Sequence, residues 1–239
     1  METKVAIVTG GSSGIGLGIT QALLARGYAV VAISRNASRR GTLAPSARLV
    51  VVDGDVGQAG SAARVVEQAA AHFDRVDLLV NNAGIFLAKP FTEHTPADYD
   101  ALVSTNLAGF VHMTQAVLGK MVPQRRGHVV NISTSLVEQP VAGVPSALSI
   151  LIKGGIEAAS QSLAIEYAEQ GIRFNTVAPG IIDTPMHSPA NHAALRNLSP
   201  ARRIGAVEDV AAAVLYLESA AFVSGEVVHV DGGAHAGKW

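Results

Sequence analysis

TGGSSGIG, residues 9–16, stands where an apolar run ends and a helical pattern begins. The run before it is KVAIVTG (4–10), and the apolar residues after it recur at the spacing of one helix face. Its glycines have the spacing G-x-x-x-G-x-G, and they are Gly10, Gly14 and Gly16. This spacing suits a tight turn in which the backbone closely approaches a ligand and the helix packs closely on the strand. A glycine-rich turn also fits an ordinary strand-to-helix connection, so the rest of the chain decides.

Apolar runs and helical patterns alternate along the rest of the chain. Strand patterns cover 4–10, 28–34, 47–53, 75–84, 127–133, 171–180 and 225–233. Helical patterns cover 14–27, 59–73, 97–122, 146–170 and 207–218. The strands are nearly all apolar, which is typical of a parallel sheet covered by helices on both faces. The alternation predicts an α/β fold, a doubly wound parallel seven-stranded sheet in a single domain, residues 1–239.

One connection in this pattern is unusually short. Residues 35–47 lie between the second and third strands and are rich in helix breakers. We expect a loop or a single helical turn there instead of a full crossover helix.

Composition and charge exclude several classes of protein. The chain has 239 residues, of which 49% are hydrophobic and 15% charged, so it can form a sizeable core. A net charge of −1 without a basic run gives no electrostatic support for nucleic-acid binding. The absence of cysteine excludes disulfides and thiolate metal sites, and the eight histidines form no metal-binding pattern. We find neither a secretory signal nor an apolar run of about 18 residues, and we expect a cytoplasmic protein without membrane spans.

Five further motifs follow the glycine turn in a fixed order. They are NNAG (81–84), Asn106 within STNLAG, HVVNIS (128–133), VAPGIIDTPM (177–186) and VSGEVVHVDGG (223–233). Together with TGGSSGIG they resemble the short-chain dehydrogenase/reductase family over essentially the whole chain. The resemblance implies a Rossmann-like fold and an NAD(P)-dependent oxidoreductase that transfers a hydride between nicotinamide and a carbonyl or alcohol substrate.

The resemblance also implies a set of cofactor contacts, carried over position by position. It assigns the pyrophosphate turn to Gly10, Ser12, Gly14, Ile15 and Gly16, adenine to Asp55 and Val56, and the ribose side to Asn82, Ala83 and Gly84. It assigns the nicotinamide end to Pro179, Gly180, Ile182 and Thr184, and the nicotinamide ribose to Lys153. Asp55 alone also fits a solvated turn, but the complete set favours a cofactor site.

The end of the second strand discriminates between the two dinucleotides. A carboxylate there would bind the ribose 2′-hydroxyl of NAD and repel the 2′-phosphate of NADP. This chain has Ser34 at that position, followed by Arg35, whose guanidinium can hold a phosphate through two hydrogen bonds. We expect NADP, with NAD as the alternative if Arg35 is only a solvated loop residue.

The active-site helix departs from the family at its most important position. The family uses a tyrosine and, four residues later, a lysine, together with a serine and an asparagine. SLAIEYAEQGIRFN (162–175) aligns with the family without a gap, which places Lys153 at the lysine position and Ser149 at the tyrosine position. Asn106 matches the asparagine. Thr134 matches the serine, but any hydroxyl of 133–135 remains a candidate, and the loop 136–145 is longer than usual.

Three readings follow from this departure. In the first, a proton reaches the substrate through Lys153 and a water, with Asn106 anchoring the water and Thr134 or a neighbouring serine binding the substrate oxygen. Ser149 is a weak acid with a short side chain and could act only through an intervening water. In the second, the chain binds NAD(P) without turnover, as a sensor or scaffold. The third, a lyase that uses no nicotinamide, is disfavoured by the intact glycine turn and the missing tyrosine.

The helix 146–170 also predicts self-association. Its first half carries apolar residues on nearly every side, namely Leu148, Ile150, Leu151, Ile152 and Ile156. Such a helix is usually buried all round, so we expect it to pack against a symmetry mate in a dimer or homotetramer. The alternative is that the substrate lid, about 183–205, covers the same surface. The substrate is expected to be a small molecule, which the sequence does not identify further.

Overall fold

Seven parallel strands form the centre of the molecule. The computed structural model describes residues 3–187 and 192–238, and their strand order is β3-β2-β1-β4-β5-β6-β7. The strands are β1 (Val5–Thr9), β2 (Ala29–Ser34), β3 (Leu49–Asp53), β4 (Leu78–Asn81), β5 (Gly127–Ile132), β6 (Ile172–Pro179) and β7 (Val227–Val230). All neighbouring strands pair in parallel. The doubly wound Rossmann-like sheet expected from the sequence is therefore confirmed.

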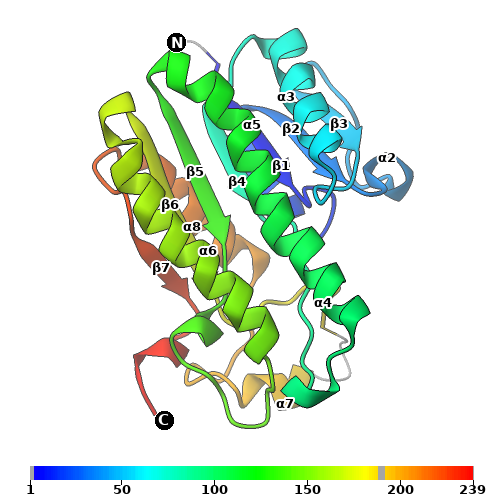
Figure 1. The fold of residues 1–239 in the computed structure, drawn as a ribbon, viewed down its shortest axis with the longest axis vertical. Coiled ribbons are helices and arrows are strands. Elements are labelled where there is room, and N and C mark those ends of the chain that lie inside the picture. Colours follow the sequence, from blue (N-terminus) through cyan, green and yellow to red (C-terminus); the bar gives the residue numbers. More distant parts are fainter. Residues whose placement is uncertain (1–2, 188–191, 239) are drawn as a thin grey trace.

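Helices cover both faces of this sheet (Figure 1). The longer ones are α1 (Gly14–Ala25), α3 (Ala59–Phe73), α5 (Gly109–Gln124), α6 (Ala147–Glu166) and α8 (Val207–Ser219). The short ones are α2 (Ala37–Arg40), α4 (Pro96–Leu102) and α7 (His192–Arg196). The single turn of α2 confirms the expectation for 35–47. In the described part of the chain, no helix combines the length and apolar character that crossing a bilayer requires.

Two predicted helices differ from their observed form. The pattern at 97–122 is α4, a π-helical segment (Val103–Ala108) and α5 in succession. The pattern at 146–170 is α6 followed by a 3₁₀ turn, Ala168–Gln170. Within the lid expected at 183–205, residues 188–191 lie outside the described residues.

The core consists of one apolar layer on each face of the sheet. Helices α3, α5 and α6 pack on one face through Val65, Met113, Val117 and Ala164. Helices α1 and α8 pack on the other through Ile19, Leu23, Val210 and Leu217. The chain order reverses between β1 and β4, and in such sheets a crevice opens at the carboxyl ends of the strands on either side of the reversal. The fold therefore locates a ligand site beside the ends of β1 and β4.

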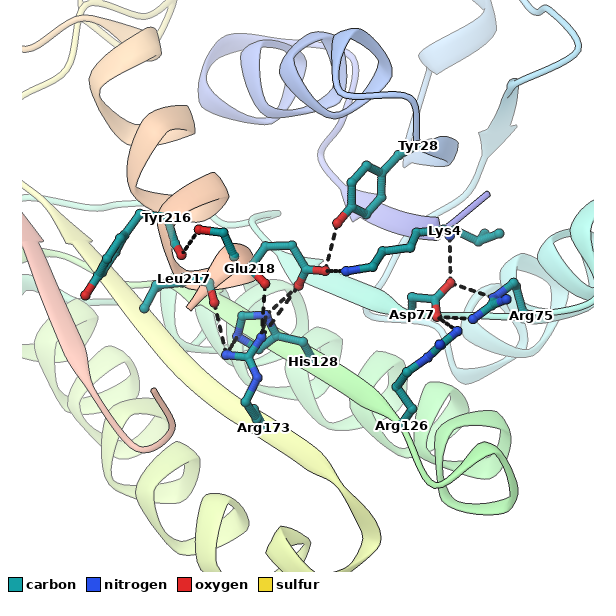
Figure 2. Close-up of polar contacts among 12 residues, drawn as sticks. Lys4, Tyr28, Arg75, Asp77, Arg126, His128, Arg173, Tyr216, Leu217 and Glu218 are labelled. Carbon is teal, nitrogen blue, oxygen red and sulfur yellow. Dashed lines mark hydrogen bonds and ion pairs between the residues drawn. The ribbon is translucent and has the colours of Figure 1, made fainter. Parts of the chain in front are cut away.

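An ionic network occupies the opposite, amino edge of the sheet (Figure 2). The Glu218 carboxylate accepts hydrogen bonds from Lys4 at 2.8 Å, Tyr28 at 2.7 Å and His128 at 2.8 Å. Burial alone would raise the pKa of Glu218, but these hydrogen bonds outweigh burial and lower it to about 2. Asp77 forms a similar centre, which is bound by two arginines, Arg75 and Arg126. The network joins the end of α8 to the starts of the strands.

Candidate active site

The glycine turn after β1 has a backbone that only glycine can form. Gly10 and Gly14 have positive φ angles of +65° and +50°. A Cβ atom on Gly16 would lie 2.3 Å from the carbonyl oxygen of Gly10, so even alanine would collide with the backbone. The amide of Asn82, at the end of β4, donates to the Thr9 carbonyl at 2.8 Å and braces the turn. Asn82 thus supports the turn from the neighbouring strand.

The residues of this turn fit the pyrophosphate of a dinucleotide. Helix α1 starts at Gly14. The side chain of its N-cap residue, Ser13, makes no capping hydrogen bond within the described residues, and the first turn of the helix contains no acidic residue. Its N-terminal N–H groups and positive dipole end therefore suit an anion. A Cβ on Gly14 would lie 3.4 Å from the Cβ of Thr184. The segment assigned to the nicotinamide end therefore lies directly beside the turn.

The structure places the remaining cofactor candidates around this turn. Ser12 is fully buried, and its backbone N–H donates to the Ser34 hydroxyl at 3.3 Å. The Ser12 hydroxyl itself has no partner in the described part of the chain. The other candidates lie at the carboxyl ends of their strands or just after them, with Ile15 in the first turn of α1: Asp55, Val56, Ala83, Gly84, Pro179, Gly180 and Ile182.

The end of β2 has the character expected for NADP. Ser34 is the last residue of β2, and Arg35 after it is exposed. The nearest carboxylate in the sheet is that of Asp53, whose β3 position pairs with Ser34. Asp53 accepts a hydrogen bond from the Ser38 backbone N–H at 2.9 Å, at the start of α2. The sequence reasoning missed this neighbouring acid, which β-strand register alone could have shown.

Lys153 is the centre of the second half of the site. Its ammonium group lies among protein atoms and donates to the Ile132 carbonyl at 2.6 Å. Burial lowers the pKa of Lys153 to about 8, and the charge of Glu157 opposes that shift. A Cβ on Gly84 would lie 3.5 Å from the Lys153 ammonium and 3.2 Å from Asn106 Oδ1. These three residues therefore lie close together, and Lys153 and Asn106 line a common small cavity.

Asn106 holds the loop that follows β4. It is buried in the π-helical segment, a rare geometry that is frequent at functional sites. Its Oδ1 accepts from the Ile85 backbone N–H, and its amide donates to the Ile85 carbonyl, both at 2.9 Å. These two hydrogen bonds use one of the two N–H donors and one of the two lone pairs of the amide. The role of Asn106 in anchoring a water therefore stays a prediction.

Ser149 is bound to backbone. It is 1% exposed, and its hydroxyl both accepts from the Leu87 N–H and donates to the Leu87 carbonyl, each at 3.3 Å. Two residues further on, the Lys89 N–H donates to the Pro145 carbonyl at 2.7 Å. The loop after β4 therefore lies against the start of α6. Both hydrogen bonds of the Ser149 hydroxyl go to the backbone of one residue, Leu87.

The structure distinguishes the three hydroxyls at the end of β5. Ser133 and Ser135 are buried, whereas Thr134 is half-buried and accepts from the Leu136 N–H at 3.3 Å. The Ser133 hydroxyl donates to the Glu157 carboxylate. Thr134 is therefore the most exposed of the three. Glu157 was missed by the sequence reasoning, although its position four residues after Lys153 on one helix face was a usable signal.

The chain matches known proteins over almost its whole length. The family described as enoyl-(acyl carrier protein) reductase matches residues 10–235. The 3-oxoacyl-(acyl-carrier-protein) reductase FabG of Salmonella typhimurium is 35% identical, over 98% of this chain and 98% of its own length. A solved structure of an ElxO variant with NADPH bound has a TM-score of 0.90 at 27% identity, covering 99% of this chain and 100% of its own. A gluconate 5-dehydrogenase from Burkholderia cenocepacia, in complex with NADP and tartrate, has a TM-score of 0.89 at 28% identity, covering 100% and 97%.

Proposed function

The chain belongs to the short-chain dehydrogenase/reductase family, and from that premise we propose that it is an NADP-dependent oxidoreductase acting on a small carbonyl or alcohol substrate. When bound, the nicotinamide cofactor supplies or accepts the hydride. The observation that supports the proposal best is the convergence of Lys153, Asn106 and Gly84 beside an anion-fitting glycine turn. The NADPH and NADP in the related structures favour the phosphorylated cofactor, as does Arg35.

Each residue of the site has a distinct role in this proposal. The backbone of Gly10–Gly16 binds the pyrophosphate, and the Thr134 hydroxyl holds the substrate oxygen. The Lys153 ammonium passes a proton to that oxygen through a water. Asn106 positions the loop at Ile85 that borders Lys153. A pKa of about 8 suits Lys153 to this role, because a proton donor works best when its pKa lies near the working pH.

A second candidate function has one observation in its favour. The Ser149 hydroxyl accepts from the Leu87 N–H and donates its proton to the Leu87 carbonyl, which does not favour proton transfer from this position. A chain that binds NADPH and turns nothing over, as a sensor or scaffold, would also tolerate this arrangement. The cofactor-binding half of the proposal is common to both candidates.

Binding followed by turnover separates them. We expect NADPH fluorescence to rise on binding and NADPH to be oxidised with at least one member of a broad carbonyl panel. Lys153→Ala should then lower kcat by about 10²–10⁴-fold, while Ser149→Ala changes it little. Binding without oxidation across the panel would favour the silent protein. Equal insensitivity to both substitutions would refute the lysine relay.

We also propose that α6 takes part in a homo-oligomer. Within one chain, Leu148, Ile152 and Ile156 already pack against α4 and α5, so part of the expected partner surface is intramolecular. Leu151 and Ile165 remain 66% and 82% exposed on the outer side of α6. Light scattering should show a dimer or tetramer that Leu151→Glu weakens. A monomer at all concentrations would contradict this. The cytoplasmic location stays a prediction.

A further inference from the structure

We propose that Glu157, buried one helical turn beyond Lys153, is a positioning residue whose negative charge keeps Lys153 in its protonated, proton-donating form. The inference rests on the proposed relay through Lys153. It adds a second ionisable group to that relay, which acts on the substrate only through the lysine.

The end of β5 holds both groups of this pair. Lys153 and Glu157 are four residues apart on α6 and share one face of the helix. The Lys153 ammonium donates to the carbonyl of Ile132, and the next residue, Ser133, donates its hydroxyl to Glu157. The Ser133 N–H is in turn fixed on β6 by the Val177 carbonyl at 2.8 Å. Amine and carboxylate are thus tied to two consecutive residues of one rigid strand end.

Burial makes the charge of Glu157 effective. Its side chain is 7% exposed, so solvent screens its field at Lys153 weakly. The other groups placed around the ammonium, the Ile132 carbonyl, the Asn106 amide and Gly84, carry no net charge. A buried ammonium surrounded only by neutral groups tends to lose its proton. Glu157 is the group that opposes this tendency.

A second carboxylate lies close enough to serve as a control. Glu138 lies in the loop after β5, and its charge raises the pKa of Glu157. It also forms a 3.4 Å contact with His229, but half of its side chain is exposed. Burial raises the pKa of Glu157, and the Ser133 hydrogen bond and the charge of Lys153 oppose this rise. Glu157 and Glu138 therefore differ in burial while carrying the same charge.

The titration of Lys153 tests the inference directly. Protein with ¹³Cε-labelled lysine gives one NMR signal for each of Lys4, Lys89, Lys120, Lys153 and Lys238, and Lys153→Met identifies the relevant one. Glu157→Gln keeps the acceptor for Ser133 but removes the charge. We expect the midpoint of Lys153 to fall by about one pH unit. Glu138→Gln should move it by less than about 0.3 units, because exposed charges are screened.

Two further measurements complete the test. Glu157→Asp retains the charge and should hold the Lys153 midpoint near the wild-type value. In wild-type protein, the Lys153 signal should show a second, smaller inflection at the pH where Glu157 titrates, which requires no variant to fold. An unchanged midpoint in Glu157→Gln, an equal shift in Glu138→Gln, or a missing second inflection would each overturn the inference.

Turnover is a separate readout. In an active enzyme, the alkaline limb of carbonyl reduction should move to lower pH in Glu157→Gln by the same amount as the NMR midpoint. A shifted midpoint in a protein that oxidises no NADPH would leave the inference standing and refute the proposed function. Turnover of NADPH together with an unshifted Lys153 midpoint would support the proposed function and refute the inference about Glu157.

Discussion

At the scale of single residues, we predict that Ser149 sets the character of the site, because the resemblance to the family assigns its position to a tyrosine. Its hydroxyl is bound on both sides by the backbone of Leu87, and its side chain is enclosed. The surroundings of Ser149 therefore fit a small side chain. The hydrogen bond from the Lys89 N–H to the Pro145 carbonyl joins the two loops that meet there.

We expect that a tyrosine placed at position 149 does not create a working proton donor. In Ser149→Tyr the ring has to displace Leu87, and overpacking of this kind costs about 1–3 kcal/mol in the free energy of unfolding. We expect a lower melting temperature and a turnover no higher than wild type. Ser149→Ala, which loses only the hydrogen bonds, should cost about 1 kcal/mol. A 100-fold or greater gain in kcat on Ser149→Tyr would show that the site still accommodates a phenol.

Ser34 is the residue that we expect to set the preference between NADPH and NADH. Its position at the end of β2 is where a carboxylate would meet the 2′-phosphate of NADP. In Ser34→Asp we expect the Kd for NADPH to rise about tenfold or more and the Kd for NADH to fall. Asparagine has nearly the same size as aspartate but no charge, so Ser34→Asn should change the Kd values for NADPH and NADH little. Isothermal titration with each cofactor measures this, and equal losses in both variants would assign the effect to shape.

At the scale of elements, the sequence predicted the sheet well and the irregular segments poorly. The apolar runs, each bounded by glycine or polar residues, specify β1 to β7 because a strand buried on both faces needs an unbroken apolar pattern. The π-helical turn at Val103–Ala108 has no such pattern, because its side chains continue the periodicity of the helices on either side. The hydrogen bonds of Ser149 and Asn106 go to backbone atoms, which carry no signal in the sequence.

The glycine turn is the element on which cofactor binding depends. Gly16→Ala would place a methyl group 2.3 Å from the Gly10 carbonyl oxygen, and the backbone must shift to relieve this. We expect the fluorescence response to NADPH to disappear and the free energy of unfolding to fall by about 1–3 kcal/mol.

A glycine in open space is the matched control for that prediction. Gly119 lies in α5. Apart from its chain neighbours and the backbone of its own helix, no described atom lies within 4 Å of the place that an alanine methyl group would take, so Gly119→Ala should bind NADPH normally. It should also gain about 0.5–1 kcal/mol in stability from the helix preference of alanine. NADPH binding that survives in Gly16→Ala would show that the turn is not the phosphate site.

At the scale of the whole molecule, the two edges of the sheet carry different kinds of residues. The carboxyl edge gathers the glycine turn, Lys153 and Asn106, and leaves space between them. The amino edge gathers Lys4, Tyr28 and His128, and each of them is hydrogen-bonded to the carboxylate of Glu218. The sequence could not reveal this second cluster, since Lys4 and Glu218 are 214 residues apart and each alone is typical of a surface charge.

The amino-edge network should make the fold sensitive to acid. The pKa of Glu218 falls from its ordinary 4.5 to about 2 in the fold, so its stabilisation is complete above pH 4.5 and is lost as the pH falls toward 2. His128 acts in the same direction, because burial lowers its pKa and the fold resists its protonation.

We expect Glu218→Gln to lower the free energy of unfolding by about 3 kcal/mol at pH 7. Denaturant titrations from pH 7 to pH 3 should show this difference shrinking below pH 4.5, while the exposed control Glu67→Gln stays near wild type throughout. A difference that keeps its full size at pH 3 would mean that Glu218 stabilises the fold by shape and not by charge.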